Sequence, residues 1–308
     1  MRRVDHWTRE YDRRRFLSNF SAEALGQRFD DIIANSVALR GVPPRLAAHA
    51  DEPRMRYWGR KLTHVSREFE HRGVRPSSDL RAIPLATDPK AQRAARVCAD
   101  WGMPPKGCLI KYGERRYLRE FVEHGRLLLR PASFYRSTDL AQGIRDDELQ
   151  FDRTVAADRM PSMTVYDGKS LQVKATGVRP FSMTQITRME TDFYLYCASL
   201  AWDPRLFLLD PRYDAAVVIH SREVLQRVDR EVRRNRAEFI EFPPFEVDYV
   251  DPVEATDADC HLPLVKHFRF SFQQEARAVW VPVAFQPTLP EITVEVGDLR
   301  GQVTLVCL

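Results

Sequence analysis

Hydrophobic positions in the first hundred residues recur at helical spacing. In one stretch they follow Ser21, a residue type that caps helices, and stop at the Gly-Val-Pro-Pro segment 41–44. They are Leu25, Phe29, Ile32, Ile33 and Val37. A second helix is predicted over residues 89–100, before the segment Trp-Gly-Met-Pro-Pro at 101–105. The pattern predicts a mainly helical region over residues 1–105, and the Pro-Pro pair marks its boundary.

After this boundary, short apolar runs bounded by turn residues predict strands. They cover 108–112, 126–130, 193–200, 215–219 and 245–250. A hairpin is predicted over 162–174, where Asp167-Gly168 lies between two such runs. Helices are predicted over 114–124, ended by Gly125, and over 221–236, capped by Ser221. Strands outnumber helices, so residues 106–308 are predicted to form an α+β domain rather than a doubly wound sheet.

The segment 268–281 reads as one long strand with charged residues in its middle. Alternation places Phe268, Phe270 and Phe272 on one face, and Glu275 and Arg277 on the other. A carboxylate on a strand is rigidly aimed, which suits a group that orients a substrate. The alternative is the solvated face of an edge strand, where a Glu/Arg pair contributes little.

Composition places the chain among ordinary globular proteins, with 44% hydrophobic and 29% charged residues. No apolar run approaches the roughly 18 residues of a membrane helix, and the charged first residues lack the apolar stretch of a secretory signal. We therefore expect a cytoplasmic protein without a membrane partner.

The five cysteines are scattered and form no Cys-x-x-Cys pair, so neither a disulfide framework nor a zinc site is indicated. Cys260, His261 and His267 are the one conceivable metal set, and quiet burial is the usual alternative for such a cysteine. We expect no metal.

The net charge of +4 is unevenly distributed. Residues 1–75 contain 16 Lys and Arg against 10 Asp and Glu, a balance of +6, which leaves −2 for the rest of the chain. A basic N-terminal third could contact nucleic acid. It could equally be a solvated helical surface.

Familiar catalytic motifs do not occur. There is no phosphate-binding loop, no Gly-x-Gly-x-x-Gly, no His-Glu-x-x-His and no Gly-x-Ser-x-Gly. What remains is a set of polar segments at predicted strand ends: Lys111-Tyr112, then Ser133-Phe134-Tyr135-Arg136, then Arg145-Asp146-Asp147-Glu148.

The order of these segments resembles a known group. Leu-Ile-Lys-Tyr, Gly-Arg-Leu-Leu-Leu-Arg-Pro-Ala-Ser-Phe-Tyr-Arg, Arg-Asp-Asp-Glu, Tyr-Leu-Tyr-Cys-Ala-Ser and Phe-Gln-Gln-Glu-Ala-Arg follow one another. This order is similar to that of poorly characterised bacterial domains related to ADP-ribosyltransferase-fold toxins and phage-defence effectors, over about residues 106–308. The chain has neither the His-Tyr-Glu set nor a clear Arg-Ser-Glu set of the best-known members.

The resemblance implies a mixed, split sheet that grips NAD in a cleft. It implies that Lys111 and Tyr112 hold the adenosine side, Tyr135 stacks on nicotinamide, and Glu275 orients the reacting ribose. Glu275 could also deprotonate the incoming nucleophile. The pyrophosphate would then need a cation, for which Arg136 and Arg145 are candidates.

Each assignment has a structural alternative. Tyr112 and Tyr135 could be half-buried core aromatics. Asp146, Asp147 and Glu148 are more typical of a solvated loop than of a magnesium site.

The expected function is transfer of ADP-ribose from NAD to a macromolecule, with nucleic acid as one candidate acceptor and a protein as another. The setting would be a bacterial toxin or phage-defence effector, restrained by an antitoxin or other regulatory partner. NAD hydrolysis without an acceptor is one alternative. A non-catalytic nucleic-acid or protein-binding module on the same scaffold is the other.

Overall fold

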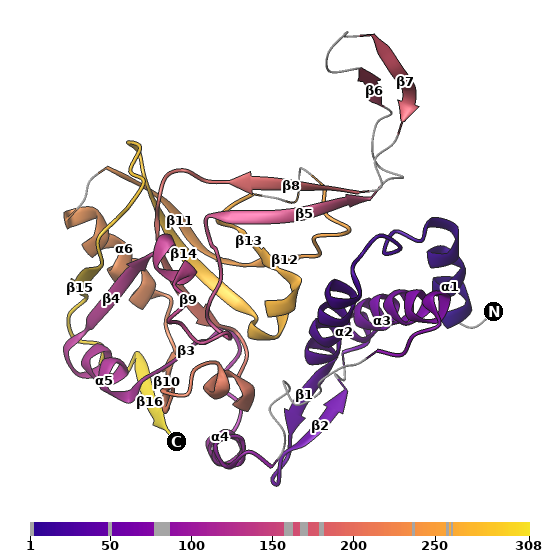
Figure 1. The fold of residues 1–308 in the computed structure, drawn as a ribbon. Coiled ribbons are helices and arrows are strands. Elements are labelled where there is room, and N and C mark those ends of the chain that lie inside the picture. The colour runs from indigo at the N-terminus through magenta and orange to yellow at the C-terminus, as the bar shows by residue number, and fades with distance from the viewer. Residues whose placement is uncertain are drawn as a thin grey trace.

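A computed structural model describes residues 3–48, 51–76, 87–156, 163–166, 172–178, 182–235, 238–256, 259 and 261–308 (Figure 1). Its helices are α1 (Arg3–Arg14), α2 (Ala22–Ser36), α3 (Glu52–Arg72), α4 (Pro89–Trp101), α5 (Arg115–His124) and α6 (Glu223–Asn235). Short 3-10 helices are η2 (Ala132–Arg136), η4 (Pro204–Leu208) and η6 (Phe268–Gln273). The strands are β1 (Val37–Arg40), β2 (Arg45–Ala48), β3 (Leu109–Gly113), β4 (Arg126–Pro131), β5 (Gln150–Ala156), β6 (Met163–Tyr166), β7 (Val173–Val178), β8 (Ser182–Arg188), β9 (Tyr194–Ser199), β10 (Ala215–Ile219), β11 (Phe239–Glu246), β12 (Asp248–Val250), β13 (Val265–His267), β14 (Glu275–Pro282), β15 (Ile292–Glu295) and β16 (Val303–Cys307).

One large sheet organises residues after 105. Its strand order is β11-β14-β9-β3-β10-β16, and β4 joins β9 while pairing with β15. The predicted α+β class is confirmed, but the sheet is antiparallel at each of these pairings, where a mixed sheet was expected. Parallel neighbours need a crossover connection, usually a helix. Here α5 and α6 connect β3 to β4 and β10 to β11, which are not neighbours in the sheet.

Helices cover both faces of this sheet. On one face α5 and α6 close a core that includes Phe121, Val228 and Trp280. On the other face α4 and η4 close a second core around Tyr112, Trp202 and Phe207. Although α4 precedes residue 105, its Ala94 belongs to this second core, so its packing groups it with the sheet.

The predicted helix ends have a visible physical basis. The Ser21 hydroxyl accepts the backbone N–H of Ala24 at 3.0 Å, as expected of a helix cap. Helix α5 ends at Gly125, which adopts a left-handed φ of 63°. A side chain there would also meet the backbone of Gly297, whose oxygen would lie 2.1 Å from an added Cβ. Only glycine satisfies both conditions.

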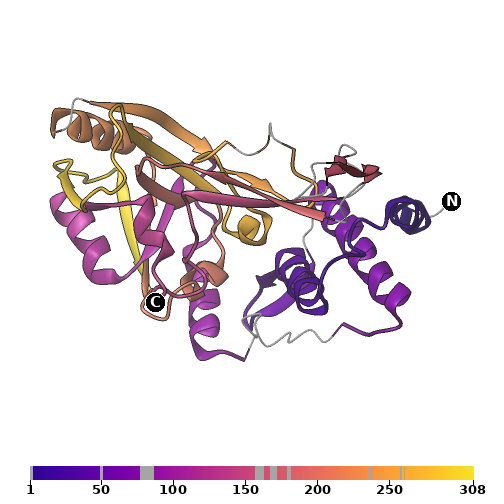
Figure 2. The ribbon, with the colours of Figure 1, turned by 45° about the horizontal axis from the view of Figure 1, so that its top comes forward.

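The N-terminal helices α1, α2 and α3 pack around one core beside the sheet (Figure 2). This core also takes Val253 and Phe268 from the C-terminal part of the chain. The region is mainly helical, as predicted. A hairpin of β1 and β2 adds to it, with residues 41–44 between the two strands, so Val37, which the helical spacing included, begins β1 instead.

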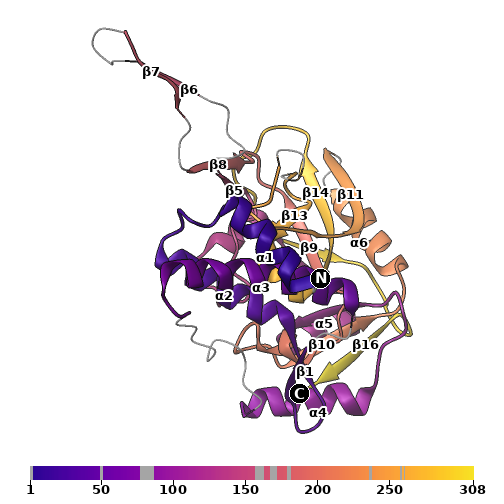
Figure 3. The same cartoon turned by 90° about the vertical axis from the view of Figure 1, so that its right-hand side faces the viewer.

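The predicted hairpin at 162–174 is present as the antiparallel pair β6 and β7, which projects from the body (Figure 3). Its expected turn, Asp167-Gly168, lies outside the described residues. No helix in the described part of the chain is long and apolar enough to cross a membrane.

The prediction of one strand over 268–281 is wrong in its first half. Residues Phe268–Gln273 form η6, Gln274 takes a left-handed φ of 45°, and the strand begins only at Glu275. This turn places Phe268 in the N-terminal core and Phe272 against the second core, the one closed by α4 and η4. Side chains on one face of a single strand could not reach both cores. Glu275 and Arg277 do point the same way, as alternation predicted.

Candidate functional site

The sheet forks along one edge of β9. Strand β4 pairs with β9 at Tyr194 and Leu195, and β3 pairs with it at Ser199. Between these contacts, the Cys197 carbonyl accepts a hydrogen bond from Lys111 Nζ at 2.7 Å rather than from a strand. The opposite edge of β9 is paired with β14 from Ser199 to Tyr194. The fork therefore opens on one side of an otherwise continuous sheet.

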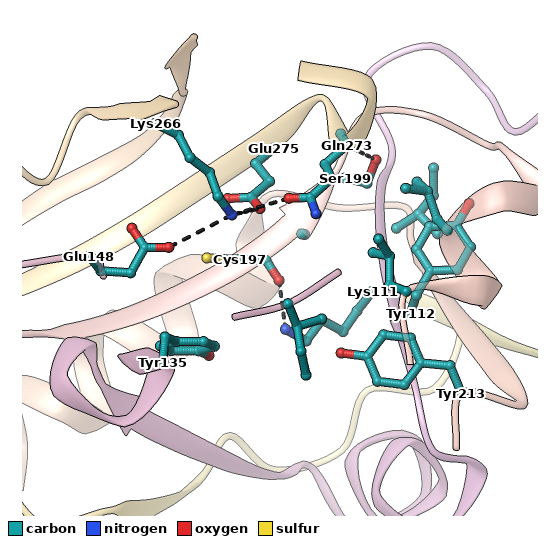
Figure 4. A pocket seen from close by; sticks show the side chains of 15 residues that line it. Lys111, Tyr112, Tyr135, Glu148, Cys197, Ser199, Tyr213, Lys266, Gln273 and Glu275 are labelled. Carbon is teal, nitrogen blue, oxygen red and sulfur yellow. Dashed lines mark hydrogen bonds and ion pairs between the residues drawn. The ribbon is translucent and has the colours of Figure 1, made fainter. Parts of the chain in front are cut away.

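A cavity of about 100 Å³ lies at this fork (Figure 4). It gathers side chains from strands β3, β9, β13 and β14 and from the segments around η2, η4 and η6. Its lining comprises Ile110, Lys111, Tyr112, Tyr135, Ile144, Glu148, Cys197, Ala198, Ser199, Leu206, Leu209, Tyr213, Lys266, Gln273 and Glu275. Four of the residues singled out by sequence, Lys111, Tyr112, Tyr135 and Glu275, thus meet at one place.

Glu275 belongs to a closed ring of four charges. Lys266 Nζ lies 2.6 Å from Glu275 Oε1, and Arg277 Nε donates to Glu275 Oε2 at 3.0 Å. Arg277 also binds Glu148 through both terminal nitrogens at 2.8 Å, and Lys266 lies 3.7 Å from the same carboxylate. The residues are buried, with Arg277 0% and Glu275 9% exposed. The solvated-face interpretation of the Glu275 strand is therefore wrong.

The charges of the ring determine the protonation states of Glu275 and Lys266. Burial alone would raise the pKa of Glu275, but Lys266 and Arg277 outweigh it and lower the pKa to about 2. Burial opposes the charge of Lys266 as well, but Glu275 and Glu148 raise its pKa. Glu275 is consequently an ionised carboxylate at neutral pH.

Lys111 stands across the cavity from this ring (Figure 4). Burial lowers its pKa, and its ammonium lies 5.0 Å from the centre of the Tyr196 ring. Of its three N–H donors, one is used by the Cys197 carbonyl. Lys111 can therefore still donate to a bound group.

The two predicted tyrosines differ in their surroundings. The Tyr112 hydroxyl donates to the Ala201 carbonyl at 2.9 Å and accepts the Asp203 N–H at 3.1 Å, and its ring stacks on Trp202. These contacts are those of a core aromatic. Tyr135 follows β4 in η2 and is half-buried at the cavity, with its ring against Phe134. Burial raises the pKa of its hydroxyl, which therefore stays protonated.

Arg136 and Arg145 do not line the cavity. Both are exposed, and each directly follows a lining residue, Tyr135 and Ile144 respectively.

A second cavity, of about 210 Å³, adjoins the first. Glu148 and Lys266 line both cavities, so the two cavities meet at this pair. The other lining residues are Asp146, Asp147, Gln150, Phe151, Asp152, Leu262, Val265, His267 and Arg269. Burial, followed by the charge of Glu148, raises the pKa of Asp146 to about 6.

The expectation of a solvated 146–148 loop is wrong for Glu148. This residue is only 5% exposed and completes the charged ring, because Arg277 draws its carboxylate inward. Asp147 has a local role, since it accepts the Leu149 N–H at 3.1 Å. Asp146 lies 3.6 Å from Arg269.

Sequence reasoning missed Lys266, Gln273 and Ser199. Gln273 accepts from Lys266 at 3.1 Å and donates to the Gly143 carbonyl at 2.7 Å. Ser199 donates to the Gln273 carbonyl at 2.6 Å. The lysine between Val265 and His267 was a usable indication, because a charge inside a short apolar run needs a buried partner.

Catalysis by a cysteine thiolate is not supported at this site. Burial, then the Glu275 charge, raises the pKa of Cys197 to about 12, so it lines the cavity as a neutral thiol. The described residues hold no group of three or more His, Cys, Asp or Glu able to bind a metal ion. Of the set considered from sequence, Cys260 lies outside the described residues, and His267 accepts the Arg269 N–H through Nδ1.

Comparison with protein-family models, with curated proteins and with solved structures finds no match to this chain.

Proposed function

We propose that the fork cavity binds the nicotinamide end of NAD and that the protein transfers ADP-ribose from it. The observation that carries this proposal is the convergence of Lys111, Tyr135 and Glu275 on one cavity from three separate elements. The fork of the sheet at β9 supports an ADP-ribosyltransferase-like fold, since the resemblance implies a split sheet that grips NAD in a cleft.

Glu275 has the fixed, ionised carboxylate that breaking the bond between ribose and nicotinamide requires. When the bond between ribose and nicotinamide breaks, nicotinamide leaves with the electron pair and positive charge develops on the ribose. A fixed, ionised carboxylate stabilises that charge and accepts a ribose hydroxyl. A carboxylate offers about four acceptor positions. Lys266 and Arg277 occupy two of them, which leaves acceptor capacity for a ligand.

Proton removal is better assigned to Asp146 than to Glu275. A general base works best when its pKa lies near the operating pH. The pKa of Glu275 is about 2, whereas that of Asp146 is about 6. The acceptor would bond to the ribose carbon through its lone pair and give its proton to Asp146, which faces the second cavity.

The size of the first cavity limits what it can enclose. Ligand pockets of proteins usually measure about 300–1,000 Å³, and this one measures about 100 Å³. It would hold the nicotinamide ring against Tyr135, and the rest of NAD would extend over the rim. Arg136 and Arg145 are exposed, each directly follows a lining residue, and they would pair with the pyrophosphate.

The second cavity favours a basic acceptor over nucleic acid. Four carboxylates line it, from Asp146, Asp147, Glu148 and Asp152, against the two cations Lys266 and Arg269. Burial lowers the pKa of His267 to about 3, so this residue adds no charge at neutral pH. The N-terminal arginines also argue less for nucleic acid than the sequence implied, because Arg28, Arg60 and Arg67 are among those held in ion pairs.

A role as a toxin or defence effector with a regulatory partner would follow from this activity, and it rests on the sequence resemblance. The competing proposal is a non-catalytic module, favoured by the completeness of the charged ring. Such a closed ring can be purely structural.

The test is NAD titration by calorimetry on purified wild type and Glu275→Gln, with nicotinamide release measured in the same samples. Binding by both proteins, with release by wild type only, supports the proposal. Full release by Glu275→Gln, or no wild-type binding at millimolar NAD, overturns it. Free ADP-ribose accumulating without any macromolecule would identify the hydrolase alternative.

A further inference from the structure

One residue of the N-terminal region forms three hydrogen bonds to the segment that leads into Glu275. Asn35 lies near the end of α2 and is 1% exposed. Its Nδ2 donates to the Arg269 carbonyl at 2.8 Å, and its Oδ1 accepts from Ser271 Oγ and from the Phe272 N–H, both at 2.8 Å. A further bond joins Nδ2 to the Asp31 carbonyl of its own helix.

These four bonds use the whole capacity of the amide, which has two N–H donors and two acceptor positions. Here three of the four bonds cross to η6, more than two hundred residues later in the chain. The C-terminal end of helix α2 therefore holds η6 in place through the side chain of Asn35.

The turn sets the start of β14. Gln274 ends it in a left-handed conformation, which a residue with a side chain adopts only when its surroundings enforce it. The Gln274 carbonyl accepts the Leu200 N–H at 2.8 Å, and the Glu275 N–H donates to the Tyr249 hydroxyl at 2.8 Å. Gln273, just before it, contacts Lys266. A shift of η6 would move Glu275 and its lysine partner together.

We propose that Asn35 is a positioning residue for Glu275, and hence that the N-terminal helices are part of the NAD site rather than a separate binding module. A second contact holds the same helix end. Arg205 donates to the carbonyls of Ala34 and Val37 at 3.1 and 2.6 Å. The proposal deepens the function proposed above and rests on it.

The test uses Asn35→Asp in the full chain. The variant keeps the shape and the acceptor oxygens but loses both N–H donors, and it places a carboxylate beside the Arg269 carbonyl. Displacement by about 1 Å can reduce a rate about 100-fold. We expect the kcat of nicotinamide release to fall between about 10- and 100-fold, with the KM for NAD changed little, because Tyr135 and Lys111 are untouched.

Amide hydrogen exchange gives a readout that does not depend on activity. In Asn35→Asp, exchange should accelerate at Phe272 and Glu275 while the α5 and α6 amides keep their protection. Gln27→Ala is the matched control, since Gln27 is exposed on the same helix and its side-chain amide donates to Asp31 Oδ1 at 2.9 Å. It should change neither kcat nor exchange at these two positions.

Ser271→Ala serves if Asn35→Asp does not fold, because it removes one of the three bonds to η6. It should shift kcat and exchange in the same direction by a smaller factor. Unchanged exchange at Phe272 and Glu275 in the variant that folds overturns the proposal, as does an unchanged kcat. If wild type releases no nicotinamide, the proposed function fails. Exchange then decides whether Asn35 orders the turn.

Discussion

Glu68 and Glu275 are both buried carboxylates held by two cations, yet only Glu275 belongs to the candidate site at the fork of the sheet. Glu68 on α3 binds Arg15 at 3.1 Å, Arg72 at 2.7 Å and the Tyr11 hydroxyl at 2.6 Å. Glu275 binds Lys266 and Arg277 at similar distances. The difference lies in what adjoins them, since Glu68 lines neither of the two cavities described and Glu275 lines the one at the fork of the sheet. A buried ion cluster alone is therefore weak evidence of function.

The largest effect should come from Glu275→Gln. Loss of the carboxylate charge removes the stabilisation of the ribose cation, so nicotinamide release per folded molecule should fall by about 100-fold or more. It also leaves Lys266 and Arg277 with less counter-charge, and the free energy of unfolding should fall by about 3–5 kcal/mol. Release assays on the folded fraction, with urea unfolding in parallel, measure the two effects. Retained release would show that Glu275 acts as Glu68 does.

Lowering the pH should reduce the free energy of unfolding over one range through Glu275 and over another through the N-terminal core. The pKa of Glu275 is about 2 in the folded protein, against an ordinary 4.5, so its contribution is complete above pH 4.5 and is lost as pH falls toward 2. In the N-terminal core, burial and then Arg60 lower the pKa of His64 to about 4 from 6.5, so stability there is lost between pH 6.5 and 4. Each contribution is on the order of 3 kcal/mol.

Matched variants separate these ranges in urea unfolding at several pH values. His64→Leu should flatten the stability curve between pH 6.5 and 4 and leave the lower range sloping. Glu275→Gln should do the reverse. The same slope in both variants would contradict these assignments.

Glu68→Gln should have a smaller effect, confined to stability. Arg15 and Arg72 are partly exposed, with side-chain exposures of 43% and 22%, so water takes over much of their solvation. We expect a loss of about 2 kcal/mol in the free energy of unfolding, with NAD affinity and release unchanged. Calorimetric titration of the folded variant checks this, and a weakened NAD affinity would mean that the two clusters are coupled.

The smallest effect should come from Tyr135. If its ring stacks on nicotinamide, Tyr135→Ala should weaken NAD binding about tenfold, whereas Tyr135→Phe, which keeps the ring, should bind normally. Equal affinity in all three proteins would leave Tyr135 as a core aromatic like Tyr112.

The boundaries of several elements followed from local chemistry. Ser21, Gly125 and the alternation of Glu275 with Arg277 each act through the backbone near them, so a sequence pattern predicts them well. The 3-10 helix η6 was not predicted by the local sequence pattern. Three phenylalanines at alternate positions suit a strand, and only the separate cores that receive Phe268 and Phe272 make the 3-10 turn the better structure.

The candidate site likewise has residues that the sequence pattern predicted and residues that it did not. The pattern of residues along the chain predicted the α+β class, the helical N-terminal region and the choice of Lys111, Tyr135 and Glu275 as residues of interest, because strand ends and charged strand positions are visible in it. The folded chain was needed to see that Glu148 and Lys266 complete the ring and that Asn35 bonds to the turn before Glu275. Glu148 and Asn35 lie more than a hundred residues before Glu275 along the chain. Burial and pairing over such separations depend on how the sheet and helices pack, which no local pattern encodes.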